Sequence, residues 1–253
     1  MNVLEIKNLD LSFGNRVIFK NAHFAIQQGE YLAVVSGNGT GKSSFFKVIL
    51  GKKIPDSQIS YTMLDSKGHT IERDNLQYDQ TNINDSIAYL ADDDQYVLDE
   101  TVSHELMIGL SNKLTKDEKM KRVDHILEMV KLAGIKNKKL RKCSSGERKL
   151  IRILQVLMIA QEKKVLLLDE PLNHLDANKI MLVNDLINVL RDKKPDLSII
   201  VITHITWLFG VHKAFKIIDG TLVETSYVDI IKPVNDFYNI GQKEQLKSIF
   251  KEV

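Results

Sequence analysis

Apolar residues follow two different periods along this chain, and the change of period divides it. Alternating apolar and polar positions at Val3–Lys7 and His23–Ile26 predict half-buried antiparallel strands. A second β-rich stretch is expected at Ser60–Ile71, with a turn at Ser66–Gly68. The first part of the chain is therefore predicted to contain an antiparallel β-subdomain.

Continuous apolar runs predict a different kind of strand, one that is buried on both faces. These runs are Tyr31–Val35, Lys164–Leu168 and Leu197–Thr203, and Ser86–Leu90 is a further strand candidate. A hairpin with a two-residue turn is predicted towards the end of the chain. Its strands are Phe215–Ile218 and Thr221–Glu224, and its turn is Asp219-Gly220.

From Thr101 onwards the apolar period becomes helical. Thr115 and Glu118 have the spacing of a capping box, Met120 to Val130 continue the period, and Gly134 is expected to end this helix. Further helices are predicted at Phe45–Leu50, Glu147–Ala160, Ala177–Arg191 and, in the polar tail after Ser226, Gln242–Lys251. We interpret residues 97–160 as a helical subdomain inserted into an α/β domain that spans residues 1–225, with residues 226–253 as a tail.

A glycine-rich loop lies between the buried strand at Tyr31–Val35 and the helix that Gly51 closes. Its residues are Ser36, Gly37, Asn38, Gly39, Thr40, Gly41, Lys42, Ser43 and Ser44. Glycines allow successive backbone N–H groups to turn towards an anion, and the following helix N-terminus adds partial positive charge. Strand, loop and helix in this order predict a phosphate-binding loop, in which Lys42 reaches the outer phosphates and Ser43 holds Mg²⁺.

A pair of carboxylates, Asp169 and Glu170, ends the second buried strand. In nucleotide-hydrolysing folds an aspartate at this position faces the Mg²⁺ of the phosphate loop. Glu170 is then placed to polarise a water against the γ-phosphate. His204 follows the third buried strand, where a γ-phosphate contact is expected. Phe13 has two open interpretations, as a core residue or as an aromatic that stacks on a base.

Composition narrows the class of protein. The chain has 253 residues and a net charge of +2, which argues against a nucleic-acid partner. Its single cysteine, Cys143, excludes an internal disulfide and suits a reducing compartment. No signal pattern and no apolar run near ~18 residues is present, so we expect a chain that neither spans a membrane nor is exported. For the basic segment Lys136–Lys142 we favour a solvated loop over a phosphate contact.

Taken together, the motifs resemble those of the ATP-binding cassette (ABC) ATPases, over about residues 3–224. Ser36–Ser43 is similar to the Walker A loop, and Val165–Leu168 with Asp169 and Glu170 is similar to Walker B and the catalytic glutamate. The remaining matches are Cys143–Arg148 with the signature motif, Asn173–Asp176 with the D-loop, His204 with the switch histidine and Phe13 with the adenine-stacking aromatic.

This resemblance implies an α/β fold, namely a P-loop NTPase core with a mostly parallel sheet, an N-terminal antiparallel β-subdomain and an inserted helical subdomain. It implies ATP and Mg²⁺ as cofactors, with Lys42, Glu170 and His204 as catalytic residues. It also implies that Ser144, Ser145, Gly146 and Glu147 contact the ATP of a partner cassette, so that two chains close head-to-tail around two nucleotides, most simply as a homodimer.

The chain departs from the family pattern at several positions. Cys143 replaces a leucine, and Ser145 replaces a glycine that allows close approach to the partner's phosphate. Where the family has the Q-loop glutamine, which touches Mg²⁺ and the attacking water, Asp92 aligns and Gln95 follows. The expected metal ligands are therefore Ser43, Asp169 and, as one of two alternatives, Asp92; we favour Gln95 for the Q-loop contact.

The resemblance favours an ATP-hydrolysing subunit of an ABC transporter, cytoplasmic and held at the inner face of a membrane by a separately encoded transmembrane permease subunit. The docking surface is expected between the Asp92–Leu98 loop and the helix near Thr101. The alternative is a soluble ABC ATPase that acts on an intracellular assembly, such as iron–sulfur cluster machinery. Translation-type members of the ABC family share the motif at Asn173–Asp176, but they normally contain two cassettes in one chain. The presence of Glu170 disfavours a nucleotide-binding regulator without ATP turnover. The short spacing between the two Walker motifs disfavours the DNA-repair relatives, which have a long coiled coil there.

Overall fold

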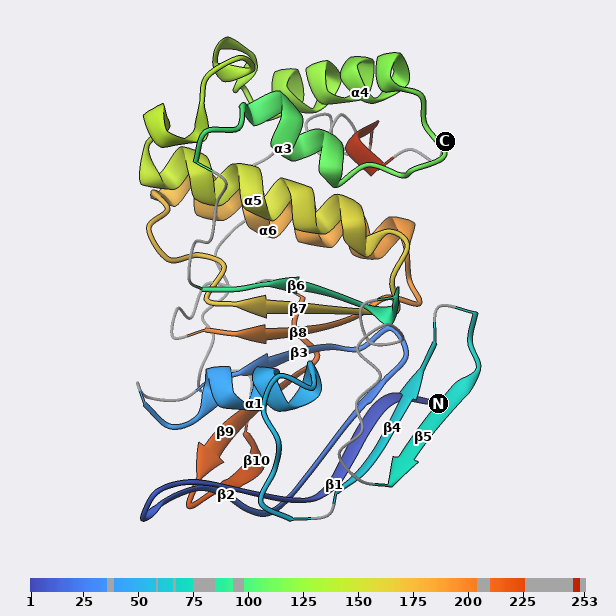
Figure 1. Ribbon diagram of the computed structural model, residues 1–253, viewed down its shortest axis with the longest axis vertical. Coiled ribbons are helices and arrows are strands. Elements are labelled where there is room, and N and C mark those ends of the chain that lie inside the picture. The colour runs from blue at the N-terminus through green and yellow to red at the C-terminus, as the bar shows by residue number, and fades with distance from the viewer. Residues whose placement is uncertain are drawn as a thin grey trace. The chain divides into compact units, whose positions relative to one another are not determined.

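The computed structural model describes residues 1–35, 39–57, 59–65, 67–74, 85–92, 98–203, 210–225 and 248–250 (Figure 1). Contacts divide the chain into two units. The first comprises Met1–Tyr89, Glu162–Glu170 and Asp196–Pro233, and the second Leu90–Gln161, Pro171–Pro195 and Val234–Val253. The first unit contains the two β-sheets, apart from the last residue of one strand, and the described residues of the second unit form four α-helices.

A four-stranded antiparallel sheet with the order β2-β1-β4-β5 forms one part of the first unit. Its strands are β1 (Asn2–Phe13), β2 (Arg16–Gln27), β4 (Ser60–Leu64) and β5 (Thr70–Asp74). The predicted antiparallel β-subdomain is confirmed. Apolar side chains of β1 and β2 that alternate in the sequence, Ile6 and Phe24 among them, are buried, so the period-2 pattern reflects one covered face.

A six-stranded sheet with the order β10-β9-β3-β8-β7-β6 forms the rest of this unit. Its strands are β3 (Tyr31–Val34), β6 (Ile87–Leu90), β7 (Val165–Asp169), β8 (Ser198–Ile202), β9 (Lys213–Ile218) and β10 (Thr221–Thr225). Strands β9, β3, β8 and β7 pair in parallel, whereas β10 pairs antiparallel with β9. Every residue of β3, β7 and β8 is buried, which explains their uninterrupted apolar runs.

The predicted hairpin of β9 and β10 turns at Asp219 and Gly220, both with positive φ, 47° and 78°. Two consecutive left-handed residues are the geometry of a type I′ turn, which matches the twist of a hairpin. The carbonyl of Gly220 also accepts a hydrogen bond from the backbone N–H of Lys20 at 3.0 Å. This contact joins the hairpin to β2 of the antiparallel sheet.

Helix α1 (Lys42–Ile49) belongs to the core of the first unit. The side chains of Phe45, Phe46, Val48 and Ile49 are fully buried. The Phe45 ring packs edge-on against Phe24, with ring centroids 4.9 Å apart. The packing of this apolar face fixes the position of α1. The glycine-rich loop that precedes α1 therefore ends at a fixed helix N-terminus.

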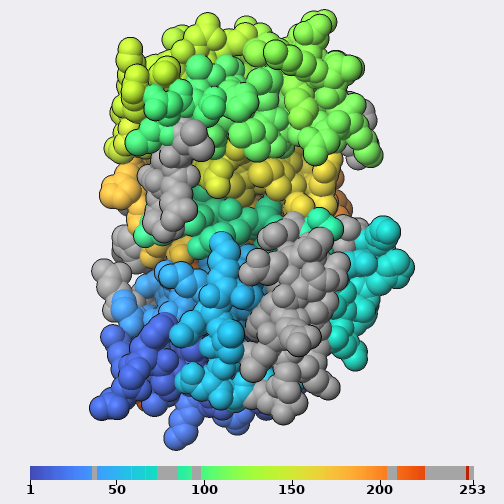
Figure 2. Space-filling view, in the orientation of Figure 1, coloured from blue at the N-terminus to red at the C-terminus, as the bar shows by residue number. Residues whose placement is uncertain are grey.

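The second unit is helical, with α3 (Val102–Ile108), α4 (Lys116–Met129), α5 (Ser145–Ala160) and α6 (Ala177–Lys193). Short 3₁₀ turns occur at Ala133–Ile135, Leu140–Lys142 and Ser248–Phe250. Helix α5 contacts α3 and α6, and α3 contacts α4. The polar face of α4 is exposed, and Figure 2 shows this helix at the molecular surface in green. The capping box predicted for Thr115 and Glu118 is confirmed.

Several predicted helix boundaries are wrong, including the start of α1, which lies at Lys42 and not at Phe45. Helix α4 ends at Met129 and not at Gly134, because Lys131 adopts a left-handed φ of 60° and the N–H of Leu132 bonds to the Leu127 carbonyl, as in a Schellman motif. Helix α5 begins at Ser145, two residues before the predicted start, and α6 continues to Lys193. The predicted helix at Gln242–Lys251 lies outside the described residues except for Ser248–Phe250.

Candidate functional site

The ends of three parallel strands lie level with one another. Val34 of β3 and Asp169 of β7 both pair with Ile202 of β8, which lies between these strands. The backbone N–H of Glu170 donates to the Ile202 carbonyl at 2.9 Å, and that of Thr203 donates to the Val34 carbonyl at 3.2 Å. The glycine-rich loop, the carboxylate pair and the segment that leads to His204 therefore all begin at one sheet edge, where ligands bind in open α/β sheets.

Within the glycine-rich loop, Ser36, Gly37 and Asn38 lie outside the described residues. Gly39 and Gly41 have positive φ angles of 76° and 104°, and Gly41 is the N-cap of α1. The guanidinium of Arg16 donates a hydrogen bond to the Gly39 carbonyl at 2.6 Å. This contact joins the first residue of β2 to the loop. Arg16 was not predicted, because an arginine after a tight turn carries no distinctive sequence signal.

Lys42 is the first residue of α1, and its side chain is buried. Ser43 and Ser44 follow it in the first turn of the helix. Asp169 and Glu170 are also buried, at 2% and 7% exposure. A serine hydroxyl and an aspartate carboxylate are hard oxygen ligands, the kind that Mg²⁺ takes together with nucleotide phosphates, so the residues present fit this ion.

Glu170 has a left-handed backbone, with φ at 45°. This conformation is uncommon for a residue with a side chain, and such strain gathers at functional positions. Pro171, which follows, disfavours the ordinary helical conformation at Glu170. The backbone thus turns sharply where the strand ends, while the Glu170 N–H remains bonded to β8.

Phe13 is the last residue of β1, and 48% of its surface is exposed. The interpretation of Phe13 as a core residue is therefore wrong, whereas stacking on a base stays a prediction. The ammonium of Lys53 lies 4.6 Å from the centre of the Phe13 ring. This cation–π contact was not foreseen, because Lys53 lies far from Phe13 in the sequence.

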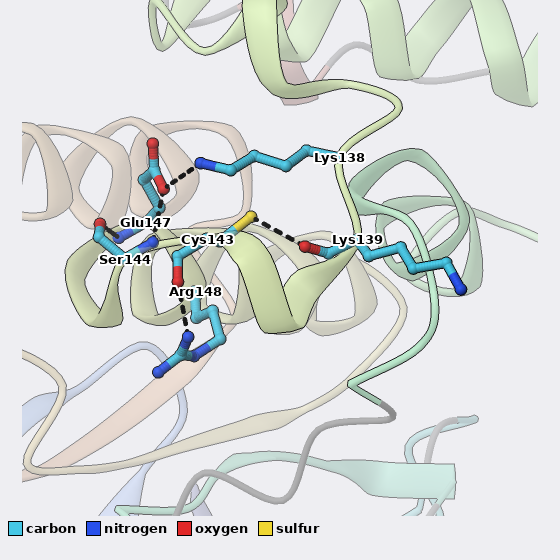
Figure 3. Close-up of polar contacts among 6 residues, drawn as sticks. All are labelled: Lys138, Lys139, Cys143, Ser144, Glu147 and Arg148. Atoms are coloured by element: carbon cyan, nitrogen blue, oxygen red, sulfur yellow. Dashed lines mark hydrogen bonds and ion pairs between the residues drawn. The ribbon is translucent and has the colours of Figure 1, made fainter.

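The signature segment begins helix α5 with a second capping box. Ser144 is the N-cap and accepts a hydrogen bond from the Glu147 N–H at 3.1 Å, while the Glu147 carboxylate accepts one from the Ser144 N–H at 2.6 Å (Figure 3). The ammonium of Lys138 lies 3.1 Å from the same carboxylate. The Ser144 N–H, with help from Lys138, holds the pKa of Glu147 below its ordinary value. Ser145 is exposed at the first helical position.

Cys143 precedes this cap and is buried. Its thiol lies 3.7 Å from the Lys139 carbonyl, and its own carbonyl accepts a hydrogen bond from Arg148 at 2.6 Å (Figure 3). Burial raises the pKa of the Cys143 thiol. The thiol is thus a packing group, as expected where the family has a leucine.

The D-loop lies against the signature segment. Asp176 is the N-cap of α6 and accepts a hydrogen bond from the Lys179 N–H at 3.0 Å, and its carboxylate pairs with the Lys179 ammonium. These contacts with Lys179 lower the pKa of Asp176. A Cβ at Gly146 would lie 3.3 Å from the His174 carbonyl oxygen, so a glycine lets the two segments approach closely.

Asp92 lies in the second unit, in the loop after β6. Its carboxylate accepts a hydrogen bond from the Asn173 side chain at 3.4 Å and lies 4.0 Å from the ammonium of Lys149. Lys149 was missed by the sequence analysis, because a lysine in a signature helix looks like a solvated charge. Gln95 and His204 lie outside the described residues, and their roles stay predictions.

The basic segment Lys136–Lys142 is an ion-paired surface. Lys136 pairs with Asp124, and Lys139 and Arg141 lie 3.5 and 2.9 Å from Asp99. These surface ion pairs agree with the prediction that this segment is a solvated loop and not a phosphate contact. They also show that Asp99, which directly follows the Asp92–Leu98 loop of the expected docking surface, is already engaged by cations of its own chain.

The sequence profile of the family described as ABC transporter matches residues 19–173. This range covers more than half of the chain and includes the glycine-rich loop, the signature segment and the carboxylate pair. The chain therefore belongs to the ABC transporter family, and the family and fold that the sequence predicted are confirmed.

Two curated relatives point to different roles within this family. The chain is 29% identical over 177 residues to the energy-coupling factor transporter ATP-binding protein EcfA1 of Fusobacterium nucleatum, with 69% of this chain and 63% of the relative covered. It is also 29% identical over 178 residues to the ribosome protection protein VmlR of Bacillus subtilis, with 68% and 27% covered. The chain thus matches less than two thirds of the length of either relative.

A solved structure supports the same fold over nearly the whole chain. The chain matches cbiO1 from Clostridium perfringens, described as part of the ABC transporter complex cbiONQ, with 26% identity and a TM-score of 0.63. The match covers 88% of this chain and 87% of that protein. In the part of this chain that the structure describes, no helix is long and apolar enough to cross a membrane.

Proposed function

We propose that this chain is the ATP-binding and ATP-hydrolysing subunit of an ABC transporter. The observation that carries the proposal is the level alignment of Val34, Ile202 and Asp169 at one edge of the parallel sheet. This alignment brings a phosphate-binding loop and a buried carboxylate pair to the same edge. The names of EcfA1 and cbiO1, both parts of transporters, support the proposal.

In the proposed site, Lys42 places its ammonium on the outer phosphates of ATP, at the positive end of α1. Gly37 to Gly41 offer backbone N–H groups to the phosphates. Ser43 and Asp169 are the proposed ligands of Mg²⁺, which neutralises phosphate charge when bound. Arg16 holds the glycine-rich loop through the Gly39 carbonyl.

Glu170 is the proposed general base. Its carboxylate polarises the water that attacks the γ-phosphate, and His204 contacts the same phosphate. The constrained backbone of Glu170 fixes the direction in which its side chain leaves the strand. Phe13 provides an exposed aromatic surface for the adenine, from which Lys53 must move if both use the same face of the ring.

The signature segment is proposed to complete the site of a second cassette. Ser144, Ser145 and Gly146 lie at the N-terminal end of the long helix α5, whose partial positive charge favours an anion. Two chains would thus share two nucleotides in a head-to-tail dimer. Asp176 and Glu147 hold the two helix ends that form this surface.

Steady-state ATP hydrolysis tests the proposal. Lys42→Ala should lower turnover at least about a hundredfold, because a removed charge-stabilising contact costs roughly 3 kcal/mol or more in the transition state. Lys47→Ala is the matched control, since Lys47 lies on the same helix with an exposed side chain. Equal turnover in both variants would contradict the role of Lys42.

The proposed partner is an integral membrane protein, which holds the cassette at the membrane surface. Leu98, exposed at 49%, precedes the start of α3 and belongs to the expected docking surface, and Ile108, the last residue of α3, is exposed at 56%. Tyr96 and Val97, expected at the same surface, lie outside the described residues. Exposed apolar residues with charged neighbours suit a protein interface.

A second candidate function is action on the ribosome. It is favoured by the match to VmlR and by the sequence motif at Asn173–Asp176, which translation-type members of the family share. Affinity purification of the full chain from its native cells, followed by separate assays for ribosomal RNA and for integral membrane proteins, distinguishes the two. Stoichiometric ribosomal RNA without a membrane protein would favour the second candidate.

A further inference from the structure

Lys149 is a buried lysine that lies near the carboxylate of Asp92. It lies on α5, two residues after Glu147 of the capping box, and its side chain is 1% exposed. Among the described residues, its amine has no hydrogen-bond partner. The carboxylate of Asp92, at 4.0 Å and with its side chain 49% exposed, is the acidic group that pairs with it in the described part of the chain. An ammonium removed from water needs such a counter-charge, since unpaired burial is costly.

Asp92 also receives a hydrogen bond from Asn173, at 3.4 Å, through the same carboxylate oxygen that faces Lys149. This oxygen therefore joins three segments of the second unit: the loop after β6, the signature helix α5 and the D-loop. The close approach of Gly146 to the His174 carbonyl brings the last two segments together at a neighbouring point.

We propose that Asp92 is a positioning residue that serves as the counter-charge of Lys149 and fixes the start of α5 against the loop after β6 and the D-loop. The carboxylate is needed at this position because the signature helix of this chain carries a buried lysine. Asp92 and Lys149 thus form a matched pair, and a neutral glutamine at position 92 would leave the lysine without its partner. The effect of the pair on ATP turnover rests on the proposed function; its effect on folding does not.

Four proteins test the pairing: the wild type, Asp92→Gln, Lys149→Gln and the double variant. Their thermal unfolding midpoints are measured without nucleotide or Mg²⁺. Asp92→Gln should lower the midpoint by about 3 °C or more, because it leaves a buried charge unpaired. In the Lys149→Gln background the same change should lower it by less than a third of that amount. Equal losses in both backgrounds would overturn the proposal.

Turnover separates positioning from metal binding. If Asp92 positions α5, Asp92→Gln should lower kcat about fivefold or more while the Mg²⁺ concentration for half-maximal activity changes less than twofold, and adding Lys149→Gln should restore most of kcat. A tenfold rise in that Mg²⁺ concentration, whatever residue occupies position 149, would instead mark Asp92 as a metal ligand and overturn the proposal.

Asp196→Asn is the matched control, because Asp196 pairs with Lys164 at 3.2 Å in the first unit, and the Lys164 side chain is 20% exposed, whereas that of Lys149 is 1% exposed. This variant should change neither kcat nor the midpoint of any Lys149 variant by more than the error. An absence of turnover in the wild type would contradict the proposed function alone, because the unfolding midpoints decide the pairing of Asp92 and Lys149 independently.

Discussion

Gly41 faces the side chain of Ile18 so closely that a Cβ at position 41 would lie 2.2 Å from the Cγ2 atom of Ile18. Gly41 also has a φ of 104°, which residues with a side chain rarely adopt. Ile18 is buried in β2, next to the Arg16 that bonds to Gly39. The glycine-rich loop therefore packs against β2 of the antiparallel sheet, in addition to its chain connection to β3.

Gly41→Ala should therefore reduce ATP affinity by about tenfold or more, because the loop must shift to relieve both the steric overlap and the strained backbone. Equilibrium binding of a fluorescent ATP analogue measures the loss. Gly68→Ala is the matched control, since Gly68 has a φ of 86° but no atom of the described residues lies within 4 Å of its added Cβ. If the two variants bind ATP equally well, the fit against Ile18 is unimportant for the loop.

The two capping boxes allow a comparison of stability with function. Glu118→Ala and Glu147→Ala each remove the carboxylate that bonds back to an N-cap, so each should destabilise the protein. Glu147→Ala should in addition lower the ATPase rate several-fold, because it loosens the signature segment. Denaturant unfolding and steady-state turnover measure the two effects. Equal rates in the two variants would argue against a role of the signature cap in turnover.

Acid should weaken the cap at Glu147. Since its folded pKa is depressed, the carboxylate contributes stability that is fully present above its unfolded value, about 4.3, and that is lost as the pH falls through the lower folded pKa. Glu147→Gln, which keeps the shape of the cap, should therefore approach the wild type in stability as the pH decreases below that range. Denaturant midpoints between pH 7 and acid conditions measure the difference. A gap between the two proteins that is independent of pH would contradict the ionic contribution.

Leu98→Glu should weaken the association with a membrane protein by about tenfold, because it places a charge in the proposed apolar contact. Ile54→Glu is the matched control: Ile54 is 59% exposed and belongs to the first unit, whereas Leu98 and α3 belong to the second. Recovery of the partner with each tagged variant after detergent extraction measures the association. Unchanged recovery with Leu98→Glu, at normal ATP binding, would place the docking surface elsewhere.

Much of the fold could be predicted because burial leaves a direct mark on sequence. Strands β3, β7 and β8 are buried at every position and are apolar except for Asp169 at the end of β7 and Ser198 at the start of β8. The β9–β10 turn carries the Asp-Gly pair that its geometry requires. The end of α4 could not be predicted, since Lys131 there takes the left-handed conformation that glycine normally provides. Local residue preference favoured Gly134, but the backbone bond from Leu132 to Leu127 ended the helix earlier.

Some residues of the candidate site could likewise be predicted from the sequence, and others could not. Its motif residues were predictable because phosphate binding and hydrolysis demand particular side chains at fixed spacing. Arg16, Lys53 and Lys149 were not, because each acts through a partner far away in the sequence, namely Gly39, Phe13 and Asp92. Such contacts depend on topology, and a single sequence carries no local signal of which long polar side chain will meet which partner.

The central claim is that two copies of this chain bind ATP between them and that Glu170 activates the water that ends this state. Glu170→Gln keeps the size of the side chain but removes the base, so turnover should fall at least about a hundredfold while ATP binding is retained. Sedimentation of this variant with Mg²⁺ and ATP measures the claim directly. We expect a mass twice that of one chain, which returns to the monomer value when Lys42→Ala is added. A Glu170→Gln variant that stays monomeric with ATP, or that hydrolyses ATP at the wild-type rate, would contradict the account.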